Sequence, residues 1–176
     1  MSELRRWIDV DVYGGCGPLK CPLSATKLCL RMLEQRYFFY LAFENSLCVD
    51  YVTEKFWRTL QRDVVSVVLG AANYSRLVPP GVHLDVRHFR SPRHLADRLR
   101  ELMTSDVGTY AEMLRRKRRL SCLSDDEDDF QTKLCRYLVE TEGRTQTTDL
   151  DVSWNARLMC TTPRRFYRGV ADMIAY

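Results

Sequence analysis

Seven polar side chains gather just after an apolar segment that ends at Phe43: Glu44, Asn45, Ser46, Tyr51, Thr53, Glu54 and Lys55. They fall between a predicted strand and a predicted helix. The start of a helix offers unpaired backbone N–H groups and the positive end of the helix dipole, which suits a pyrophosphate. Lys55 can add a positive charge to a phosphate oxygen. The residue types and their spacing therefore indicate a ligand that carries phosphate.

The carboxylates and the tyrosine of this set suggest what else such a ligand contains. Glu54 or Glu44 can accept hydrogen bonds from vicinal sugar hydroxyls, as acidic residues do for ribose. Tyr51 can stack on, or hydrogen-bond to, a base or a sugar. Polar residues at a strand-to-helix turn are mostly caps and solvent contacts, so the residue types alone leave both interpretations open.

The surrounding residues have the pattern of a strand–helix–strand unit. Residues 37–43 are continuously apolar and aromatic, which predicts a strand buried on both faces and favours a parallel sheet. Apolar residues then recur every four positions from Val52 to Leu60, which predicts a helix with Asp50 as its N-cap. Residues 64–69 are rich in β-branched side chains and predict the second strand.

Further elements are expected on either side of this unit. Residues 8–13 alternate between apolar and polar side chains and predict a strand. The others are a short helix over 24–34, a strand over 82–86, a helix opened by Ser91 and Pro92 with Leu95, Leu99 and Leu102 as its buried stripe, a helix from Val107, and a helix over 131–140. Strands alternating with helices predict an α/β, doubly wound, parallel-sheet domain. Ligands of such sheets bind beyond the carboxyl ends of the strands, which puts the residues after Phe43 first.

The bulk properties set the outer limits. A length of 176 residues suggests one domain with a sizeable core. The net charge of +4 is mild and fits an anionic ligand without requiring nucleic acid. No stretch reaches the roughly 18 apolar residues of a membrane span, and the N-terminus has no apolar signal core. These residues are therefore expected to be soluble, with any targeting segment outside them.

The seven cysteines favour disulfide bonds over a metal site. They are Cys16, Cys21, Cys29, Cys48, Cys122, Cys135 and Cys160. The spacing of the first two is not that of a zinc site, and no histidine lies nearby in the sequence. Disulfides in a secretory compartment are the stronger expectation. The pairing cannot be read from the sequence, and an odd count leaves at least one cysteine unpaired within the chain.

Two charge runs are interpreted as solvated surface. The basic run over 115–119 is expected to be an exposed helix end, where cations suit the helix dipole. The acidic run over 125–129 is expected to be exposed and to face a basic neighbour. Nucleic-acid binding is not expected, because the cations are bunched in one run instead of being spread over a face with aromatic residues between them.

Residues 43–55, Phe-Glu-Asn-Ser-Leu-Cys-Val-Asp-Tyr-Val-Thr-Glu-Lys, resemble the motif of the α1,3-fucosyltransferase family. That motif is Phe-Glu-Asn-Ser, a short spacer, then Asp-Tyr-(Val/Ile)-Thr-Glu-Lys. Flanking blocks keep the family's order, namely 10–14 with Cys16 and Gly17, 67–70, Asn73 with Tyr74, 78–81, and Ser91 with Pro92. The resemblance covers residues 3–140. It predicts a nucleotide-sugar-binding domain over residues 1–140 and leaves a C-terminal tail, 141–176, unassigned.

The resemblance implies a Rossmann-like domain that is the C-terminal half of a GT-B glycosyltransferase. Such an enzyme transfers fucose from GDP-fucose, with inversion, to an N-acetylglucosamine or glucose hydroxyl of a glycan acceptor. By position, Asn45, Tyr51, Glu54 and Lys55 are expected to contact the donor. Lys55 would face the diphosphate and Glu54 the sugar hydroxyls, while Glu44 and Thr53 shape the turn. No metal is a required cofactor, although Mn²⁺ or Mg²⁺ stimulation is compatible, and the family implies a type II Golgi membrane protein.

The chain also departs from the family pattern. It has no counterpart of the N-terminal domain that binds the acceptor and supplies the general base, so no catalytic residue is expected here. Asp63 replaces a glycine and Ser66 a proline. Two hypotheses follow: the donor half of a fucosyltransferase, or a catalytically incomplete fragment that binds nucleotide sugar without turnover.

Overall fold

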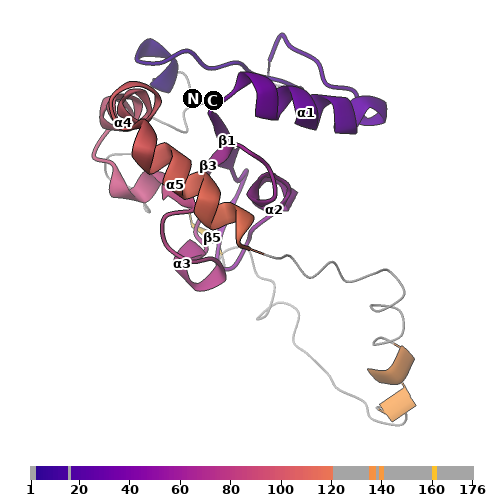
Figure 1. The fold of residues 1–176 in the computed structure, drawn as a ribbon. Coiled ribbons are helices and arrows are strands. Elements are labelled where there is room, and N and C mark those ends of the chain that lie inside the picture. Colours follow the sequence, from indigo (N-terminus) through magenta and orange to yellow (C-terminus); the bar gives the residue numbers. More distant parts are fainter. Residues whose placement is uncertain (1–2, 16, 121–134, 138, 141–159, 162–176) are drawn as a thin grey trace.

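A three-stranded parallel sheet lies at the centre of the computed structural model, which describes residues 3–15, 17–120, 135–137, 139–140 and 160–161 (Figure 1). The sheet order is β1 (Phe39–Phe43), β3 (Val65–Leu69) and β4 (His83–Asp85). Strands β1 and β3 pair from Phe39 with Val65 to Phe43 with Leu69, and β3 pairs with β4 over three positions. The predicted parallel sheet is confirmed in this part of the chain.

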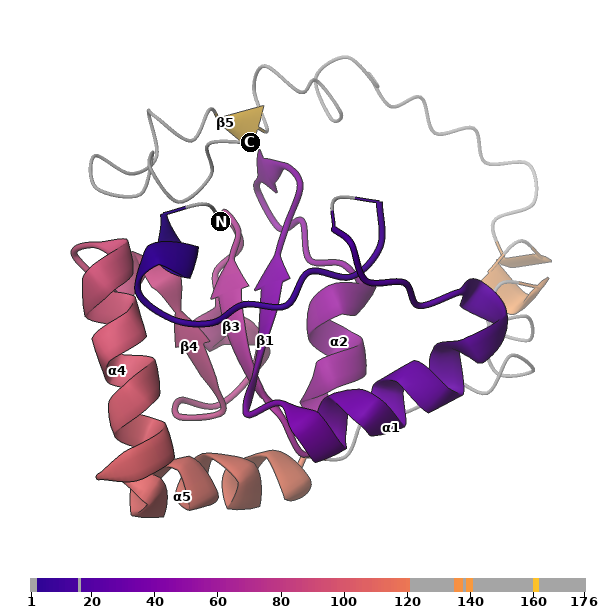
Figure 2. The same ribbon diagram turned by 90° about the horizontal axis from the view of Figure 1, so that it is seen from above.

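The remaining elements surround the sheet (Figure 2). They are the 3-10 turns η1 (Leu4–Arg6), η2 (Leu23–Ala25) and η3 (Val86–His88), the helices α1 (Thr26–Arg36), α2 (Glu54–Leu60), α3 (Tyr74–Leu77), α4 (Pro92–Thr104) and α5 (Val107–Arg118), and the short strands β2 (Leu47–Cys48) and β5 (Cys160–Thr161). Strands β2 and β5 form a separate antiparallel pair. The predicted helices over 24–34, after Ser91 and from Val107 are confirmed.

Both faces of the sheet are covered by apolar side chains. On one face, Val67 and Leu69 pack with Leu95 and Leu99 of α4. On the other, Val68 joins a cluster that includes helices α2 and α3. All five residues of β3 are buried, because it is the central strand. Strand β1 lies at the edge of the described sheet, and only Ala42 among its residues is fully buried, so the expectation that residues 37–43 form a strand buried on both faces is met only in part.

Helix α4 begins as its sequence predicts. Ser91 caps it, because its Oγ accepts a hydrogen bond from the His94 N–H at 3.1 Å, and Pro92 takes the first helical position. The predicted stripe of three leucines is buried. The cap and the apolar spacing therefore fix both where this helix starts and which face it turns to the sheet.

The prediction of a strand over residues 8–13 is wrong, because this segment does not join the described sheet. In the described part of the chain its backbone makes one isolated bridge, between Tyr13 and Leu19. The side chains still alternate, since Ile8 and Val10 pack against the core whereas the aspartates between and after them are exposed. An alternating pattern reports which side chains are buried, not which backbone groups are paired. Here the segment crosses one face of the sheet (Figure 2).

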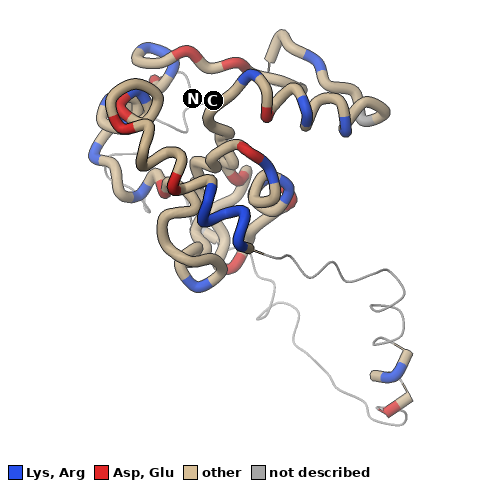
Figure 3. Tube along the Cα trace, viewed as in Figure 1, with Lys and Arg blue, Asp and Glu red and all other residues tan. Residues whose placement is uncertain are grey.

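The basic end of α5 is only partly the solvated surface that was expected. Figure 3 shows the cations gathered there. Arg115 and Arg116 are exposed and pair with Glu112 on the same helix. Lys117 is instead buried, with 3% of its surface exposed. Its ammonium donates to three backbone carbonyl oxygens, those of Thr59, Arg62 and Val64. The interpretation of the whole run as solvated is therefore wrong at Lys117.

Two disulfide bonds are formed, Cys21–Cys29 and Cys48–Cys160. The preference for disulfides is thus confirmed for four of the cysteines. Cys135 is exposed and forms no disulfide, while Cys16 and Cys122 lie outside the described residues. The described residues hold no group of three or more His, Cys, Asp or Glu side chains that could bind a metal ion.

Some expectations fall outside the described residues. The acidic run over 125–129 lies outside the described residues. Of the helix expected over 131–140, only residues 135–137 and 139–140 are described, and they are helical. Within the described ranges, no helix combines the length and the apolar character that crossing a bilayer requires.

Candidate ligand-binding site

The carboxyl ends of the three parallel strands bring the polar side chains together at one edge of the sheet. Strand β1 ends at Phe43, β3 at Leu69 and β4 at Asp85. The Glu44 N–H donates to the Leu69 carbonyl at 2.9 Å, so Glu44 continues the pairing of β1 with β3 by one residue. This is the edge at which ligands of open parallel sheets bind.

Glu44 fastens the start of α2 to this edge. Its Oε1 accepts from the Thr53 N–H at 2.8 Å, and its Oε2 accepts from the Thr53 hydroxyl at 2.8 Å. The Lys55 ammonium lies 3.5 Å from the same Oε2. The Glu44 side chain is fully buried, whereas that of Lys55 keeps 30% of its surface exposed. Lys55 is therefore held at the edge while part of its side chain stays exposed to solvent.

The prediction that Asp50 is the N-cap of helix α2 is wrong. Thr53 is the N-cap residue, helix α2 begins at Glu54, and Thr53's N–H is bonded by the carboxylate of Glu44. Asp50 lies earlier, in the turn after β2, with a left-handed φ of 55°. Aspartate is among the residues that tolerate this conformation, which explains its place in a turn. Thr53 makes no side-chain cap hydrogen bond of its own; instead the Glu44 carboxylate, nine residues earlier, holds it in place.

Asn45 and Tyr51 lie together on the loop of residues 44–53. The Tyr51 hydroxyl donates to the Asn45 side-chain oxygen at 3.2 Å, and the Tyr51 N–H donates to the Cys48 carbonyl at 3.2 Å. Glu54 is exposed at the first position of α2. The structure thus gathers all six predicted site residues into one loop-and-helix unit, and Glu44 serves the protein itself rather than facing outward.

Sequence reasoning missed a second polar group on the same edge. Tyr74 is fully buried, and the Arg87 guanidinium lies 5.9 Å from its ring centre. The Arg87 Nε donates to both carboxylate oxygens of Asp85, at 2.9 and 2.8 Å. Arg87 comes directly after the predicted strand over 82–86, so the strand-end rule could have found this pair.

Tyr74 is packed tightly against the end of β3. In the described part of the chain its hydroxyl has no hydrogen-bond partner. Burial raises the pKa of Tyr74, and the carboxylates of Glu44 and Asp85 raise it further, so the phenol stays protonated. A Cβ placed on Gly70 would lie 2.6 Å from the Tyr74 hydroxyl oxygen and 3.4 Å from the Glu44 Cγ. Glycine at position 70 therefore makes room for both.

We expect Gly70→Ala to lower the free energy of unfolding by about 1–3 kcal/mol, because the added methyl group must displace the tyrosine ring in a packed core. Gly108→Ala is the matched control. No atom lies within 4 Å of the added carbon at that position, and alanine is the better helix former. Chemical denaturation of the two variants measures the difference, and a Gly70→Ala protein as stable as Gly108→Ala contradicts the packing argument.

A large cavity of about 980 Å³ meets the site at Glu54 and Lys55. It lies between residues 4–14, helix α1, strand β1 and helix α2. The basic residues that line it outnumber the acidic ones: Arg5, Arg6, Arg36, Lys55, Arg58 and Arg100 against Asp9, Asp11 and Glu54. The lining of the cavity as a whole therefore carries more positive than negative charge.

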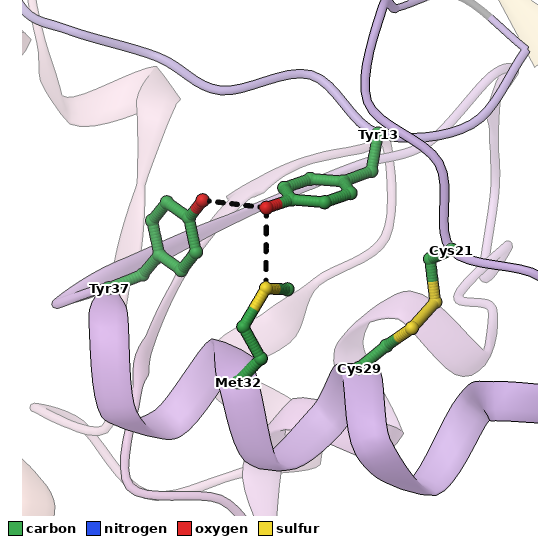
Figure 4. Close-up of a disulfide and its surroundings, with 5 residues drawn as sticks. All are labelled: Tyr13, Cys21, Cys29, Met32 and Tyr37. Carbon is green, nitrogen blue, oxygen red and sulfur yellow. Dashed lines mark hydrogen bonds between the residues drawn. A yellow bond between two sulfur atoms is a disulfide. The ribbon is translucent and has the colours of Figure 1, made fainter.

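A tyrosine network on this cavity joins α1 to the N-terminal segment (Figure 4). The Tyr37 hydroxyl donates to Asp11 at 2.6 Å and lies 2.9 Å from the Tyr13 hydroxyl. The hydrogen bond to Asp11 is the main cause that raises the pKa of Tyr37. Tyr13 also contacts the sulfur of Met32, and Cys21–Cys29 ties the start of α1 to the preceding loop.

Comparison with known proteins shows which family the chain belongs to. Residues 1–154 match the model of the family described as Glycosyltransferase family 10 (fucosyltransferase) C-term. The chain belongs to this family. It is 46% identical to Alpha-(1,3)-fucosyltransferase C of Drosophila melanogaster over 109 residues, which cover 62% of the chain and 25% of that protein. It is 36% identical over 180 residues to Glycoprotein 3-alpha-L-fucosyltransferase A of the same organism, covering 98% of the chain and 35% of that protein.

A crystal structure of an α1,3-fucosyltransferase has a similar fold, with a TM-score of 0.50 and 20% sequence identity over 76% of this chain and 40% of that one. The predicted fold class is thereby confirmed: an α/β, Rossmann-like domain with a parallel sheet, from the C-terminal half of a GT-B glycosyltransferase. The chain spans between a quarter and about a third of the length of the two fly relatives.

Proposed function

We propose that the chain is the nucleotide-sugar-binding half of an α1,3-fucosyltransferase. The whole enzyme would transfer fucose from GDP-fucose, with inversion, to an N-acetylglucosamine or glucose hydroxyl of a glycan. One observation carries the proposal: a buried carboxylate, Glu44, holds the cationic Lys55 at the carboxyl edge of a parallel sheet, within the run of residues 43–55 that resembles the family motif.

In this proposal Lys55 meets the diphosphate of the donor. Breaking the bond between the sugar and GDP leaves negative charge on the diphosphate, and a fixed cation stabilises that charge as it develops. No metal ion is a required ligand, because the cation of the protein serves this purpose, and Mn²⁺ or Mg²⁺ would at most stimulate. Glu54, exposed one residue earlier, accepts hydrogen bonds from the sugar hydroxyls.

Asn45 and Tyr51 would contact the donor from the loop, where their side chains already touch. Deprotonation of the acceptor hydroxyl is assigned to the acceptor-binding domain, since none of the six site residues is proposed as the base. A membrane anchor of a type II Golgi protein would likewise belong to a part of the enzyme other than these residues.

A second candidate is that these 176 residues bind nucleotide sugar without turnover, since none of the six site residues is proposed as the base. An assay of fucose transfer to an N-acetyllactosamine acceptor separates the two. Transfer by the isolated chain would exclude the second candidate, and binding without transfer supports it.

We expect GDP to raise the melting temperature of the wild-type chain by about 3–6 °C at a concentration roughly ten times its dissociation constant. Lys55→Ala is expected to remove most of this shift. Lys27→Ala is the matched control, because Lys27 is an exposed cation on α1 that does not line the cavity. Differential scanning fluorimetry gives the readout, and a folded wild-type protein that GDP fails to stabilise overturns the proposal.

A further inference from the structure

The loop that carries Asn45 and Tyr51 is covalently tied to a segment far along the chain. Cys48 lies between these two residues in sequence and forms a disulfide with Cys160, 112 residues away. Around the bond, β2 and β5 pair as antiparallel strands over two positions, Leu47 with Thr161 and Cys48 with Cys160. The disulfide therefore reaches the middle of the candidate binding loop.

The two ends of this loop are fixed differently from its tip. At the base, the buried Glu44 carboxylate holds Thr53 through two hydrogen bonds of 2.8 Å. At the tip, the contacts are weaker, because the Tyr51–Asn45 hydrogen bond of 3.2 Å is exposed to water. Val49 is 52% exposed, and Asp50 takes a left-handed conformation that costs a non-glycine residue free energy.

Three ties hold the tip: a two-residue ladder, the exposed Tyr51–Asn45 hydrogen bond and the 3.2 Å hydrogen bond from the Tyr51 N–H to the Cys48 carbonyl. They give the tip little intrinsic order, since ordering each backbone residue costs conformational entropy. A disulfide that closes a long loop offsets much of that cost. Its geometry also matters: Cys48 stands three residues after Asn45 and three before Tyr51, so fixing Cys48 restrains both.

We infer that Cys48 and Cys160 are positioning residues for the nucleotide, and that their disulfide holds Asn45 and Tyr51 in the arrangement that binds GDP. The inference rests on the proposed function. The cysteines touch no ligand themselves; they act through the loop. Opening the bond adds two electrons and two protons and yields two thiols, with dithiothreitol as donor, which becomes its cyclic disulfide. Among the described residues, the two-residue ladder then remains to join β2 to β5.

The other disulfide provides the matched control. Cys21–Cys29 spans eight residues and ties the start of α1 to the preceding loop. Figure 2 shows helix α1 and strand β5 near opposite ends of strand β1. Loss of Cys21–Cys29 tests what any missing disulfide does to the protein, without touching the loop of residues 44–53.

The experiment measures the dissociation constant of GDP by isothermal titration calorimetry at 25 °C. Cys48→Ser with Cys160→Ser is expected to raise it about tenfold, the loss expected when a preorganised loop must be ordered on binding. Cys21→Ser with Cys29→Ser should change it less than twofold. Dithiothreitol should weaken binding by the wild type to the same extent, re-oxidation should restore it, and the Cys48→Ser, Cys160→Ser protein should be insensitive to both.

Each outcome decides something. Oxidised wild type without affinity for GDP overturns the proposed function and this inference with it. Wild type that binds GDP equally well before and after reduction overturns the inference alone. A loss of affinity that appears equally in both double variants, or that accompanies loss of the far-ultraviolet circular dichroism spectrum, shows general destabilisation and also overturns it.

Discussion

Glu44→Ala is expected to lower the free energy of unfolding by about 3–5 kcal/mol and to abolish measurable GDP binding. The Glu44 carboxylate is fully buried and serves three donors: the Thr53 N–H, the Thr53 hydroxyl and the Lys55 ammonium. Truncation leaves the two groups of Thr53 without their acceptor and frees the cation. A donor that loses its partner inside the protein costs more than the hydrogen bond itself contributed, because the group has already left water.

A graded series separates this effect from simple loss of volume. Thr53→Val removes one hydrogen bond and keeps the shape, so we expect a loss of about 1 kcal/mol. Glu44→Gln should fall between the two, because one acceptor oxygen remains while the new amide presents a donor to Thr53. Glu54→Ala, which truncates an exposed neighbouring carboxylate, should change stability by less than about 0.5 kcal/mol. Urea unfolding measures the series, and a Glu44→Ala protein as stable as Glu54→Ala contradicts the argument.

The elements that the sequence predicted well are those whose own residues determine them. Strand β3 is rich in β-branched residues and is buried at every position, and α4 carries an apolar stripe and follows its own cap, Ser91. The motif over residues 43–55 also predicted which side chains gather, because strand, turn and helix are contiguous there. Local pattern was sufficient in each of these cases.

The failures have separate causes. Asp50 is not the N-cap of α2, because the Glu44 carboxylate, nine residues before Thr53, holds the Thr53 N–H and hydroxyl, and the helix begins after Thr53. Residues 8–13 alternate as a strand does, yet they lie across a face of the sheet rather than in it. The pairing of Cys48 with Cys160 spans 112 residues, and no spacing rule covers such a distance.

Two departures from the family pattern turn out to have partners of their own. The Ser66 hydroxyl, in place of a proline, lies 2.7 Å from the Thr59 hydroxyl inside the core. Asp63, in place of a glycine, accepts two hydrogen bonds from Arg118 at 3.0 and 2.8 Å. These hydrogen bonds are the main cause that lowers the pKa of Asp63 below its usual value. Each replacement is therefore accommodated by a neighbour, and neither disrupts the unit formed by α2 and β3.

Lys117 shows how far the interpretation of a charge run can miss. A run of basic residues at a helix end suits solvent, and Arg115 and Arg116 follow that rule. The ammonium of Lys117 instead reaches the carbonyl oxygens of Thr59, Arg62 and Val64, where α2 ends and β3 begins. Helix ends leave carbonyls without intrahelical partners, and a side chain from α5 here bonds to one such carbonyl, that of Thr59, and to two in the segment after the helix.

Lys117→Met is expected to lower the free energy of unfolding by about 2–3 kcal/mol at pH 7. Methionine keeps the apolar stem but removes a buried charged donor from three carbonyls. The Thr59 and Arg62 carbonyls each retain one backbone donor, at 3.1 and 2.8 Å, which keeps the loss below that of a fully orphaned group. Arg115→Met, at an exposed cation of the same run, is the matched control and should change stability by less than about 0.5 kcal/mol.

The same lysine gives the protein a distinctive dependence on pH. Burial lowers the pKa of Lys117 to about 8, from an ordinary value of 10.5 in the unfolded chain. Between these two values the unfolded state binds more protons than the folded state, so the contribution of Lys117 makes stability rise with pH, in total by roughly 3 kcal/mol. Tyr110, whose pKa burial raises to about 12, acts in the opposite direction only above pH 10. Urea unfolding of the wild type and of Lys117→Met at pH 7, 8, 9 and 10 tests this. The free energy of unfolding of the wild type should rise relative to that of the variant above pH 8. If the difference between the two free energies stays constant instead, the ammonium keeps its proton, and its three carbonyl partners outweigh the cost of its burial.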